Sequence, residues 1–177
     1  MSGHVQTVAL TCHPLSPCGA HCAIEARIQR EAGTLRVAYL VTGDITALRI
    51  PRTSPPQRGD RLWQHTCCEL FVARAGDPGY LEFNFSPSGA WAAYAFATYR
   101  ERVGDADLLP RSHATCSPQE LAIEASVAMG GRLRIGVAAV IEEKTGALSY
   151  WALRHAPGKP DFHHPDAFAL ELDEDRA

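Results

Sequence analysis

The chain of 177 residues has almost no lysine: Lys144 and Lys159 are the only two, and the other basic residues are arginines. Its formal net charge is −3. Nucleic-acid binding needs clustered positive charge to neutralise phosphates, so the sequence predicts no nucleic-acid partner. The length predicts a single domain over residues 1–177, large enough to bury about 70% of the surface that the unfolded chain exposes.

Long apolar runs are also missing. None approaches the roughly 18 consecutive residues that a membrane-spanning helix needs, so no membrane partner is predicted. A secretion signal has a basic segment followed by a long apolar core. The first residues, MSGHVQTVALTCHPLSPC, do not have this pattern. We therefore expect the protein to stay in the cytoplasm.

The six cysteines lack the paired C-x2-C spacing that is typical of a strong zinc site. In a reducing compartment they are expected to be free thiols. Cys67 and Cys68 are adjacent on a predicted strand, so their side chains should point to opposite faces and not pair. Structural zinc stays open as a less favoured alternative at one cluster, formed by Cys12, His13, Cys18, His21 and Cys22.

Helical periodicity of convincing length is absent, whereas ten segments have the composition and alternation of strands. These are Val5–Cys12, His21–Gln29, Leu35–Val41, Arg61–Ala73, Tyr80–Phe85, Ala90–Ala97, Glu120–Met129, Arg132–Glu142, Leu148–His155 and Phe168–Leu172. Arg49–Arg61 is a predicted loop, and no strand is assigned to the polar stretch Glu101–Pro118. Short turns, among them a two-residue hairpin at Gly130-Gly131, imply antiparallel neighbours. The sequence thus predicts an all-β antiparallel β-sandwich of jelly-roll or immunoglobulin-like type.

Strand periodicity divides Arg61–Ala73 into two faces, because successive side chains on a strand point to opposite sides. One face becomes purely apolar toward its end, so we expect it to face the core between two sheets. The other face carries Trp63, His65, Cys67, Glu69 and Phe71.

Tyr80–Phe85 divides in the same way, and Glu82 and Asn84 lie on its polar face. If the two strands pair as a hairpin, Glu82 and Asn84 share a face with Trp63, His65 and Glu69. Leu148–His155 could add Tyr150 and Arg154 to this face.

That combination suits a polar small molecule, above all a sugar. Apolar C–H faces of sugars stack on aromatic rings, and their hydroxyl groups bond to carboxylates, amides and guanidinium groups. The predicted ligand-binding set is Trp63, His65, Glu69, Glu82, Asn84, Arg154 and Lys159. A solvated outer face held by Glu–Arg pairs across strands explains the same pattern equally well.

The segment Arg154–Asp166 holds three of the eight histidines and three prolines. Histidines beside carboxylates can indicate a metal site, but the adjacent His163 and His164 cannot easily bind one ion together. A structured loop at the rim of the ligand site, with Asp161 making turn hydrogen bonds, is the favoured interpretation. No metal or cofactor is predicted.

Three blocks of sequence resemble DOMON-like proteins related to family 9 carbohydrate-binding modules. They are LWQHTCCELF (Leu62–Phe71), YLEFNFSPSGAWAAY (Tyr80–Tyr94) and WALRHAPGKPDFHHPDAFALEL (Trp151–Leu172), and the similarity extends from about His13 to Leu172. The pattern of the family is matched by Trp63, Glu69, Phe71, Asn84 and Gly89, with His65 where an acidic residue often stands.

The resemblance implies a β-sandwich whose members bind sugars or, in some branches, haem, and it is strongest to stand-alone bacterial members. A non-catalytic binding module for a carbohydrate or sugar-like molecule is the leading hypothesis. Haem binding is an alternative, weakened because Met129 is the only internal methionine. A glycoside-processing enzyme is a further alternative, since Glu69 and Glu82 as cross-strand neighbours would lie about 5 Å apart. A homodimer through edge strands is also open.

Overall fold

The structure, a computed structural model, describes residues 5–174, which form thirteen strands and three short 3-10 helices. The strands are β1 (Val5–Cys12), β2 (Ala23–Glu31), β3 (Thr34–Thr42), β4 (Gln57–Arg58), β5 (Cys67–Arg74), β6 (Tyr80–Phe85), β7 (Ala90–Thr98), β8 (Glu101–Asp105), β9 (Arg111–Cys116), β10 (Glu120–Ala128), β11 (Leu133–Glu142), β12 (Leu148–Ala152) and β13 (Leu170–Leu172). The 3-10 helices are η1 (Ile45–Ala47), η2 (Leu62–Gln64) and η3 (Pro165–Ala167). Within residues 5–174, no helix is long and apolar enough to cross a membrane.

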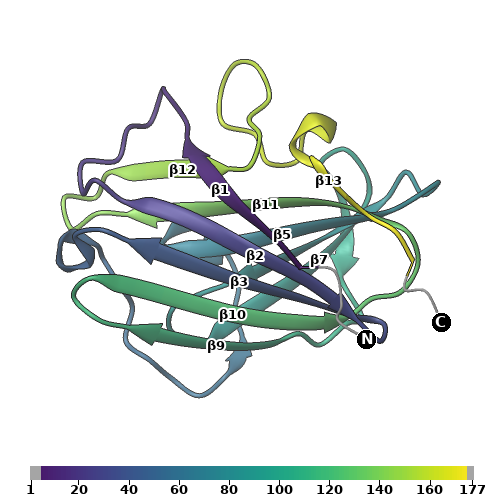
Figure 1. The fold of residues 1–177 in the computed structure, drawn as a ribbon, viewed down its shortest axis with the longest axis horizontal. Coiled ribbons are helices and arrows are strands. Elements are labelled where there is room, and N and C mark those ends of the chain that lie inside the picture. The colour runs from purple at the N-terminus through teal and green to yellow at the C-terminus, as the bar shows by residue number, and fades with distance from the viewer. Residues whose placement is uncertain (1–4, 175–177) are drawn as a thin grey trace.

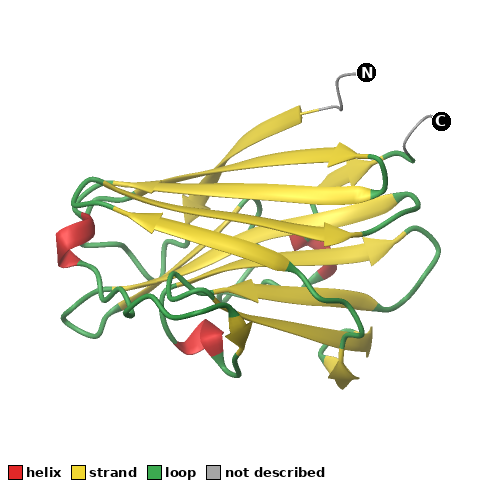
Figure 2. Cartoon of the chain, turned by 90° about the horizontal axis from the view of Figure 1, so that it is seen from below, coloured by secondary structure: helices red, strands yellow, loops and turns green. Residues whose placement is uncertain are grey.

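The strands follow one hydrogen-bonded path, β4-β7-β6-β5-β11-β12-β1-β2-β3-β10-β9, with β8 on β7 and β13 on β11. All neighbours are antiparallel except β4 and β7. The path folds back at β1, whose first six residues pair with β2 while Thr11 and Cys12 pair with β12. Two layers result: a front sheet (β1, β2, β3, β10, β9) and a back sheet (β12, β11, β5, β6, β7, β4, with β8 and β13). Figure 1 shows the front sheet crossing before β5 and β7, and Figure 2 shows the strands from the side.

The main core lies between the two sheets. Strand alternation turns Ile24 and Ile28 of β2 inward, and Leu70 and Val72 of β5 meet them from the back sheet. The hydroxyl group of Tyr39 on β3 crosses this core and donates a 2.6 Å hydrogen bond to the carbonyl oxygen of Glu69. The prediction that the apolar face of the segment before Ala73 faces the inter-sheet core is therefore confirmed.

A second apolar cluster covers the outer face of the back sheet. It contains Phe71, Tyr80, Ala92, Tyr94, Phe96, Ala138, Val140, Ala152, Phe162 and Phe168. Phe162 and Phe168 come from residues 153–169, hereafter the covering loop, which links β12 to β13 (Figure 1). The outer face of this sheet is therefore packed, and the alternative of a solvated outer face held by Glu–Arg pairs is wrong for it.

Several predicted boundaries are also wrong. The strand predicted over Arg61–Ala73 starts only at Cys67, because Arg61 takes a left-handed conformation (φ 53°) from which η2 begins. The polar stretch Glu101–Pro118 holds β8 and β9, whose edge positions need few apolar residues. The connection at Gly130-Gly131 spans residues 129–132 rather than two residues.

Gly136 on β11 is the point where the covering loop comes closest to the back sheet. A Cβ atom at this position would lie 2.9 Å from the carbonyl oxygen of Ala167. We expect Gly136→Ala to lower the free energy of unfolding by about 1–3 kcal/mol, because the packed backbone must shift. Urea denaturation tests this, with Gly130→Ala as a control in open space; equal midpoints for the two variants would contradict the expectation.

Candidate functional site

Three polar side chains of the predicted ligand set lie together on the outer face of the back sheet. Glu69 of β5 is directly opposite Asn84 of β6, and Phe71 is opposite Glu82. All three side chains are buried, with exposed fractions of 3% for Glu69, 3% for Glu82 and 0% for Asn84. The predicted shared face is therefore confirmed for these three residues, but it lies under other side chains.

Small residues extend this polar group into a row across five strands. The register places Ala92 of β7 beside Asn84, and Ala138 of β11 beside Glu69. Ala152 of β12 follows Ala138. Three alanines thus flank the acidic and amide groups, so the floor of the face is formed by short side chains, and the bulk above it comes from η2 and the covering loop.

The hydrogen bonds of the group are unevenly distributed. The amide nitrogen of Asn84 donates to Glu82 Oε1 at 2.8 Å, and the thiol of Cys67 lies 3.8 Å from Asn84 Oδ1. Within residues 5–174, no hydrogen bond is formed by the carboxyl group of Glu69, although its backbone carbonyl is bonded to Tyr39. Glu69, which is 3% exposed, thus presents a carboxyl group that has little contact with solvent and no hydrogen-bond partner in the described residues.

Burial raises the pKa of Glu69 well above its ordinary value, and repulsion from Glu82 raises it further. Burial also raises the pKa of Glu82, but the hydrogen bond from Asn84 and the charges of Arg102 and Arg100 oppose the shift. Glu69 is therefore the member of the pair that holds a proton more readily. A protonated Glu69 donates a hydrogen bond, while an ionised Glu82 only accepts.

The covering loop is seated on this face by aromatic packing around Phe71. The ring of Phe71 lies 6.4 Å from Phe162, 5.2 Å from His163 and 6.0 Å from Phe168, measured between centroids. The loop therefore forms a lid of aromatic rings beside Glu69 and Glu82.

Two hydrogen bonds orient the ring of His163, whose other nitrogen points to Glu82 without bonding to it. The backbone N–H of Arg100 donates to the hydroxyl oxygen of Tyr80 at 3.1 Å, which leaves that hydroxyl to donate to His163 Nδ1 at 2.8 Å. The proton of a neutral His163 then sits on Nε2, 3.6 Å from Glu82 Oε2. Burial and the charge of Arg100 lower the pKa of His163 to about 4, so the imidazole is neutral at physiological pH.

Asp161 fixes the loop from outside. Its carboxylate accepts from the hydroxyl of Tyr99 at 2.5 Å, from Arg100 at 2.8 Å and from the backbone N–H of His163 at 3.1 Å. The last of these is a turn hydrogen bond of the kind predicted for Asp161 from the sequence.

We expect Asp161→Ala to loosen the covering loop without unfolding the sandwich. Losing three hydrogen bonds at about 1 kcal/mol each would raise local opening by on the order of a hundredfold. Amide hydrogen exchange over residues 155–168 measures this, with Asp107→Ala as an exposed control outside the loop. Unchanged exchange in the loop would show that the aromatic packing alone holds it.

Trp63 and His65 are not on the strand face where the sequence placed them. Trp63 lies on η2, which contacts β5, β6 and β7, and its side chain is 36% exposed. The preceding residue, Leu62, packs against the outer-face cluster. Trp63 therefore stands at the margin of the buried polar group and not over it on the same strand.

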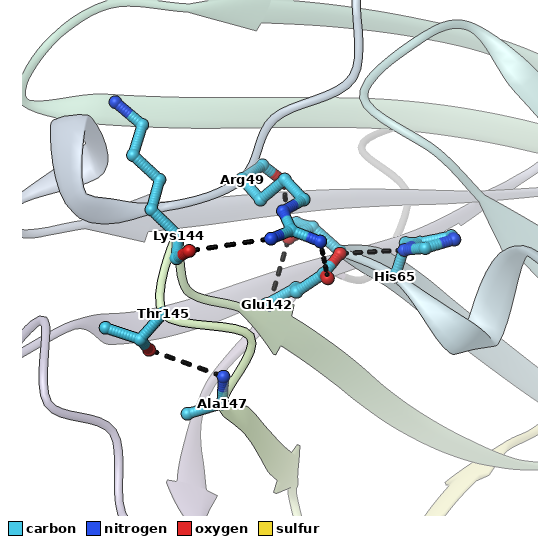
Figure 3. A network of polar contacts seen from close by, with 7 residues as sticks. Arg49, His65, Glu142, Lys144, Thr145 and Ala147 are labelled. Atoms are coloured by element: carbon cyan, nitrogen blue, oxygen red, sulfur yellow. Dashed lines mark hydrogen bonds and ion pairs between the residues drawn. The ribbon is translucent and has the colours of Figure 1, made fainter.

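His65 contacts the outer face of the back sheet through Glu142 of β11. Its Nδ1 lies 2.7 Å from Glu142 Oε2, and Arg49 Nη1 lies 2.8 Å from Glu142 Oε1, as Figure 3 shows. Glu142 follows Ala138 and Val140 on the outward positions of β11, so His65 marks the edge of this face. Its side chain is 61% exposed, which leaves Nε2 accessible.

Arg154 and Lys159 are exposed, and neither contacts the buried group. β12 ends at Ala152, so the alternation that predicted Arg154 on the face does not reach it. Tyr150, by contrast, packs against Phe162 at 6.1 Å, as its predicted position on this face requires.

Sequence reasoning missed Tyr94 and the acidic group that holds it. The Tyr94 hydroxyl donates to Asp60 at 2.7 Å, and the guanidinium of Arg102 lies 3.9 Å from the Tyr94 ring centroid. Tyr94 is directly opposite Glu82. The alternation of Ala90–Ala97 contained this signal, because it puts Ala92, Tyr94 and Phe96 on one face.

Neither zinc nor haem gains support from the side chains. Within residues 5–174, no three histidine, cysteine, aspartate or glutamate side chains are grouped to hold a metal ion. Cys12, Cys18 and Cys22 instead pack against the main core as free thiols. Met129 is buried, and its sulfur accepts from Arg74 at 3.7 Å, so it does not face the candidate site.

The two glutamates of the enzyme alternative are not direct neighbours. Glu69 faces Asn84 and not Glu82, so the two glutamates are diagonal neighbours. Diagonal positions on a sheet are about 7–8 Å apart, further than direct neighbours. The expected separation of about 5 Å, which is that of a retaining glycosidase, assumed that Glu69 and Glu82 are directly opposite each other. That assumption is wrong.

Two solved structures share the fold over most of the chain. A family 9 carbohydrate-binding module from Caldicellulosiruptor kristjanssonii, in complex with cellotriose, superimposes with a TM-score of 0.54 at 11% identity, covering 85% of this chain and 75% of the module. The fold is shared with that module. A protein from Bacteroides uniformis that is proposed to bind carbohydrate gives a TM-score of 0.62 at 16% identity, covering 93% of this chain and 84% of its own.

No family model matches the chain, and no curated protein matches it. At such low identities the likeness establishes the fold, a curled all-β sandwich. The chemistry of the site depends on its own residues.

Proposed function

We propose that the chain is a non-catalytic binding module for a saccharide, and that the site is the outer face of the back sheet around Glu69, Glu82 and Asn84. The observation that carries the proposal is the unused carboxyl group of Glu69. A carboxyl group that has little access to water and no partner in the fold loses little hydration when it bonds to a ligand, so a sugar hydroxyl is a suitable partner for it.

The residue types suit the two sides of a sugar. Trp63 would stack on the C–H face, and Glu69, Glu82 and Asn84 would bond to the hydroxyl rim. His65, Arg154 and Lys159 would contact outer hydroxyls at the margin. The differing pKa shifts of the two glutamates would provide one donor and one acceptor side by side.

Access to Glu69 requires movement, because the carboxyl group is almost fully covered. The covering loop and η2 lie over the face and both lie outside the hydrogen-bonded sheets, so they move more readily than strands. Binding would displace part of the aromatic lid, and the hydrogen bonds of Asp161 and His163 would limit how far the lid opens.

The shared fold supports this choice of ligand, since one structural neighbour is a family 9 module in complex with cellotriose. We further propose that the chain is a DOMON-like, stand-alone bacterial relative of such modules that acts in the cytoplasm. The jelly-roll or immunoglobulin-like subtype of the β-sandwich stays a prediction. So does a homodimer that forms through an edge strand.

Tryptophan fluorescence tests the proposal. The protein would be titrated with mono- and disaccharides, cello-oligosaccharides, nucleotide sugars and cell-wall precursors. We expect a saturable change that is lost in Trp63→Ala and kept in Trp91→Phe, because Trp91 faces the other side of β7, under Arg58. A folded protein that gives no saturable change with any of these sugars would overturn the proposal.

A further inference from the structure

The outer face of the front sheet carries a hollow of about 390 Å³, on the opposite side of the sandwich from Glu69. It lies across β2, β3, β10 and β9, which run side by side in Figure 1. Its lining includes Arg27, Arg36, Ala38, Arg111, His113 and Ser126. Strand alternation turns these side chains away from the core.

The register explains why a hollow forms there. Ser126 of β10 lies between Arg36 of β3 and Arg111 of β9, and Ala38 of β3 lies beside Arg27 of β2. Two short side chains therefore form the floor, and three long arginines from three different strands stand around it. Because all three belong to a hydrogen-bonded sheet, their Cα positions are fixed relative to one another.

Within residues 5–174, Arg27, Arg36 and Arg111 form no hydrogen bond or ion pair, whereas several other arginines are paired. Arg49, Arg100 and Arg132, for example, each form an ion pair with a carboxylate. Glu124 is the one acidic residue in the lining, and it forms no ion pair with Arg27, Arg36 or Arg111. In a chain with net charge −3, this hollow is a local concentration of positive charge.

We infer that the hollow is a second ligand site, for a monosaccharide that carries an oxyanion, either a phosphate or a carboxylate. Arginine is well suited to such groups, because its planar fork donates two parallel hydrogen bonds to one oxyanion. His113 and Ser126 add groups that can bond to hydroxyls. The volume lies within the range of about 300–1,000 Å³ of small-molecule sites, enough for one sugar ring with its charged group.

This site is separate from the proposed site at Glu69, so the two can be tested independently. Calorimetric titrations would use glucose, glucose 6-phosphate, glucuronic acid and inorganic phosphate. We expect glucose 6-phosphate or glucuronic acid to bind at least tenfold more tightly than glucose in the Glu69→Gln variant, where the other site is disabled. Which of the two acids binds identifies the oxyanion as phosphate or carboxylate.

Variants of the lining give the decisive comparison. Arg36→Ala and Arg111→Ala should each weaken binding of the acid at least tenfold, since a hydrogen bond to a charged group is worth about 1.5–3 kcal/mol. Glu124→Gln should tighten it by removing a repelling charge. Arg52→Ala, an exposed arginine outside the hollow, should change nothing.

Equal affinity for glucose and both acids would overturn the inference, and so would binding of the acid that survives both arginine substitutions. If glucuronic acid does not bind, equal affinity for inorganic phosphate and glucose 6-phosphate would also overturn it, because the sugar ring would then contribute nothing. The substituted side chains are exposed, so each variant should keep the thermal midpoint of the wild-type protein. That measurement confirms that a loss of affinity is not a loss of fold.

Discussion

Glu69→Gln is expected to make the protein more stable above neutral pH while weakening its saccharide binding at least tenfold. The folded-state pKa of Glu69 is raised well above the ordinary value of 4.5, first by burial and then by Glu82. The folded state therefore holds a proton that the unfolded state releases. Stability is fully present below pH 4.5 and falls as the pH rises through the raised folded-state pKa, because ionisation places a charge in a buried position.

The expected slope is about 1.4 kcal/mol of unfolding free energy per pH unit for one such group. Glutamine has nearly the same shape and no charge, so the variant should show a flatter profile and a higher urea midpoint at pH 8. Urea denaturation from pH 5 to pH 9 measures both. Glu25→Gln, an exposed position on β2, is the matched control and should run parallel to the wild-type protein; a Glu69→Gln profile that also runs parallel would contradict the account.

Such a gain in stability is informative about function. Binding sites often contain buried polar residues that lower the stability of the fold, because these residues are needed for activity. A purely structural glutamate would be expected to have its hydrogen bonds satisfied within the fold.

Phe71→Ala is expected to have the largest effect on stability, a loss of about 3–5 kcal/mol. Phe71 is buried and packs against Tyr80, Phe162, His163 and Phe168. Removing its ring therefore leaves a cavity and unseats the covering loop at the same time. Urea denaturation measures the loss of stability.

The milder pair Phe71→Leu and Phe83→Leu separates the two effects in proteins that stay folded. Phe83 is equally buried but lies in the inter-sheet core. Alkylation of Cys67, which is buried on the outer face beside Asn84, should become faster in Phe71→Leu only. Equal rates in the two variants would show that Phe71 does not seat the loop over this face.

Much of the site was predictable because strand alternation is a local property. The pattern of Tyr80–Phe85 and of the residues after Cys67 is enough to put Glu69, Glu82 and Asn84 on one face. It also identifies Leu70 and Val72 as core residues, since their period matches that of the strand.

The other features of the site depend on backbone conformations and long-range contacts that strand alternation does not predict. A left-handed Arg61 converts the start of the predicted strand into η2 and removes Trp63 from the shared face. The partner of His65 is Glu142, 77 positions away. The covering loop buries the polar face through long-range packing, which no pattern within β5 or β6 reveals.

Calorimetric titration of the wild-type protein and Glu69→Gln with cello-oligosaccharides and with the best sugar of the fluorescence panel tests the central claim most directly. We expect saturable binding by the wild-type protein and at least a tenfold weaker affinity in Glu69→Gln, since depriving a buried polar group of its hydrogen-bond partner costs about 1–3 kcal/mol. Equal affinities in the two proteins would contradict the claim that the buried face around Glu69 is the saccharide site.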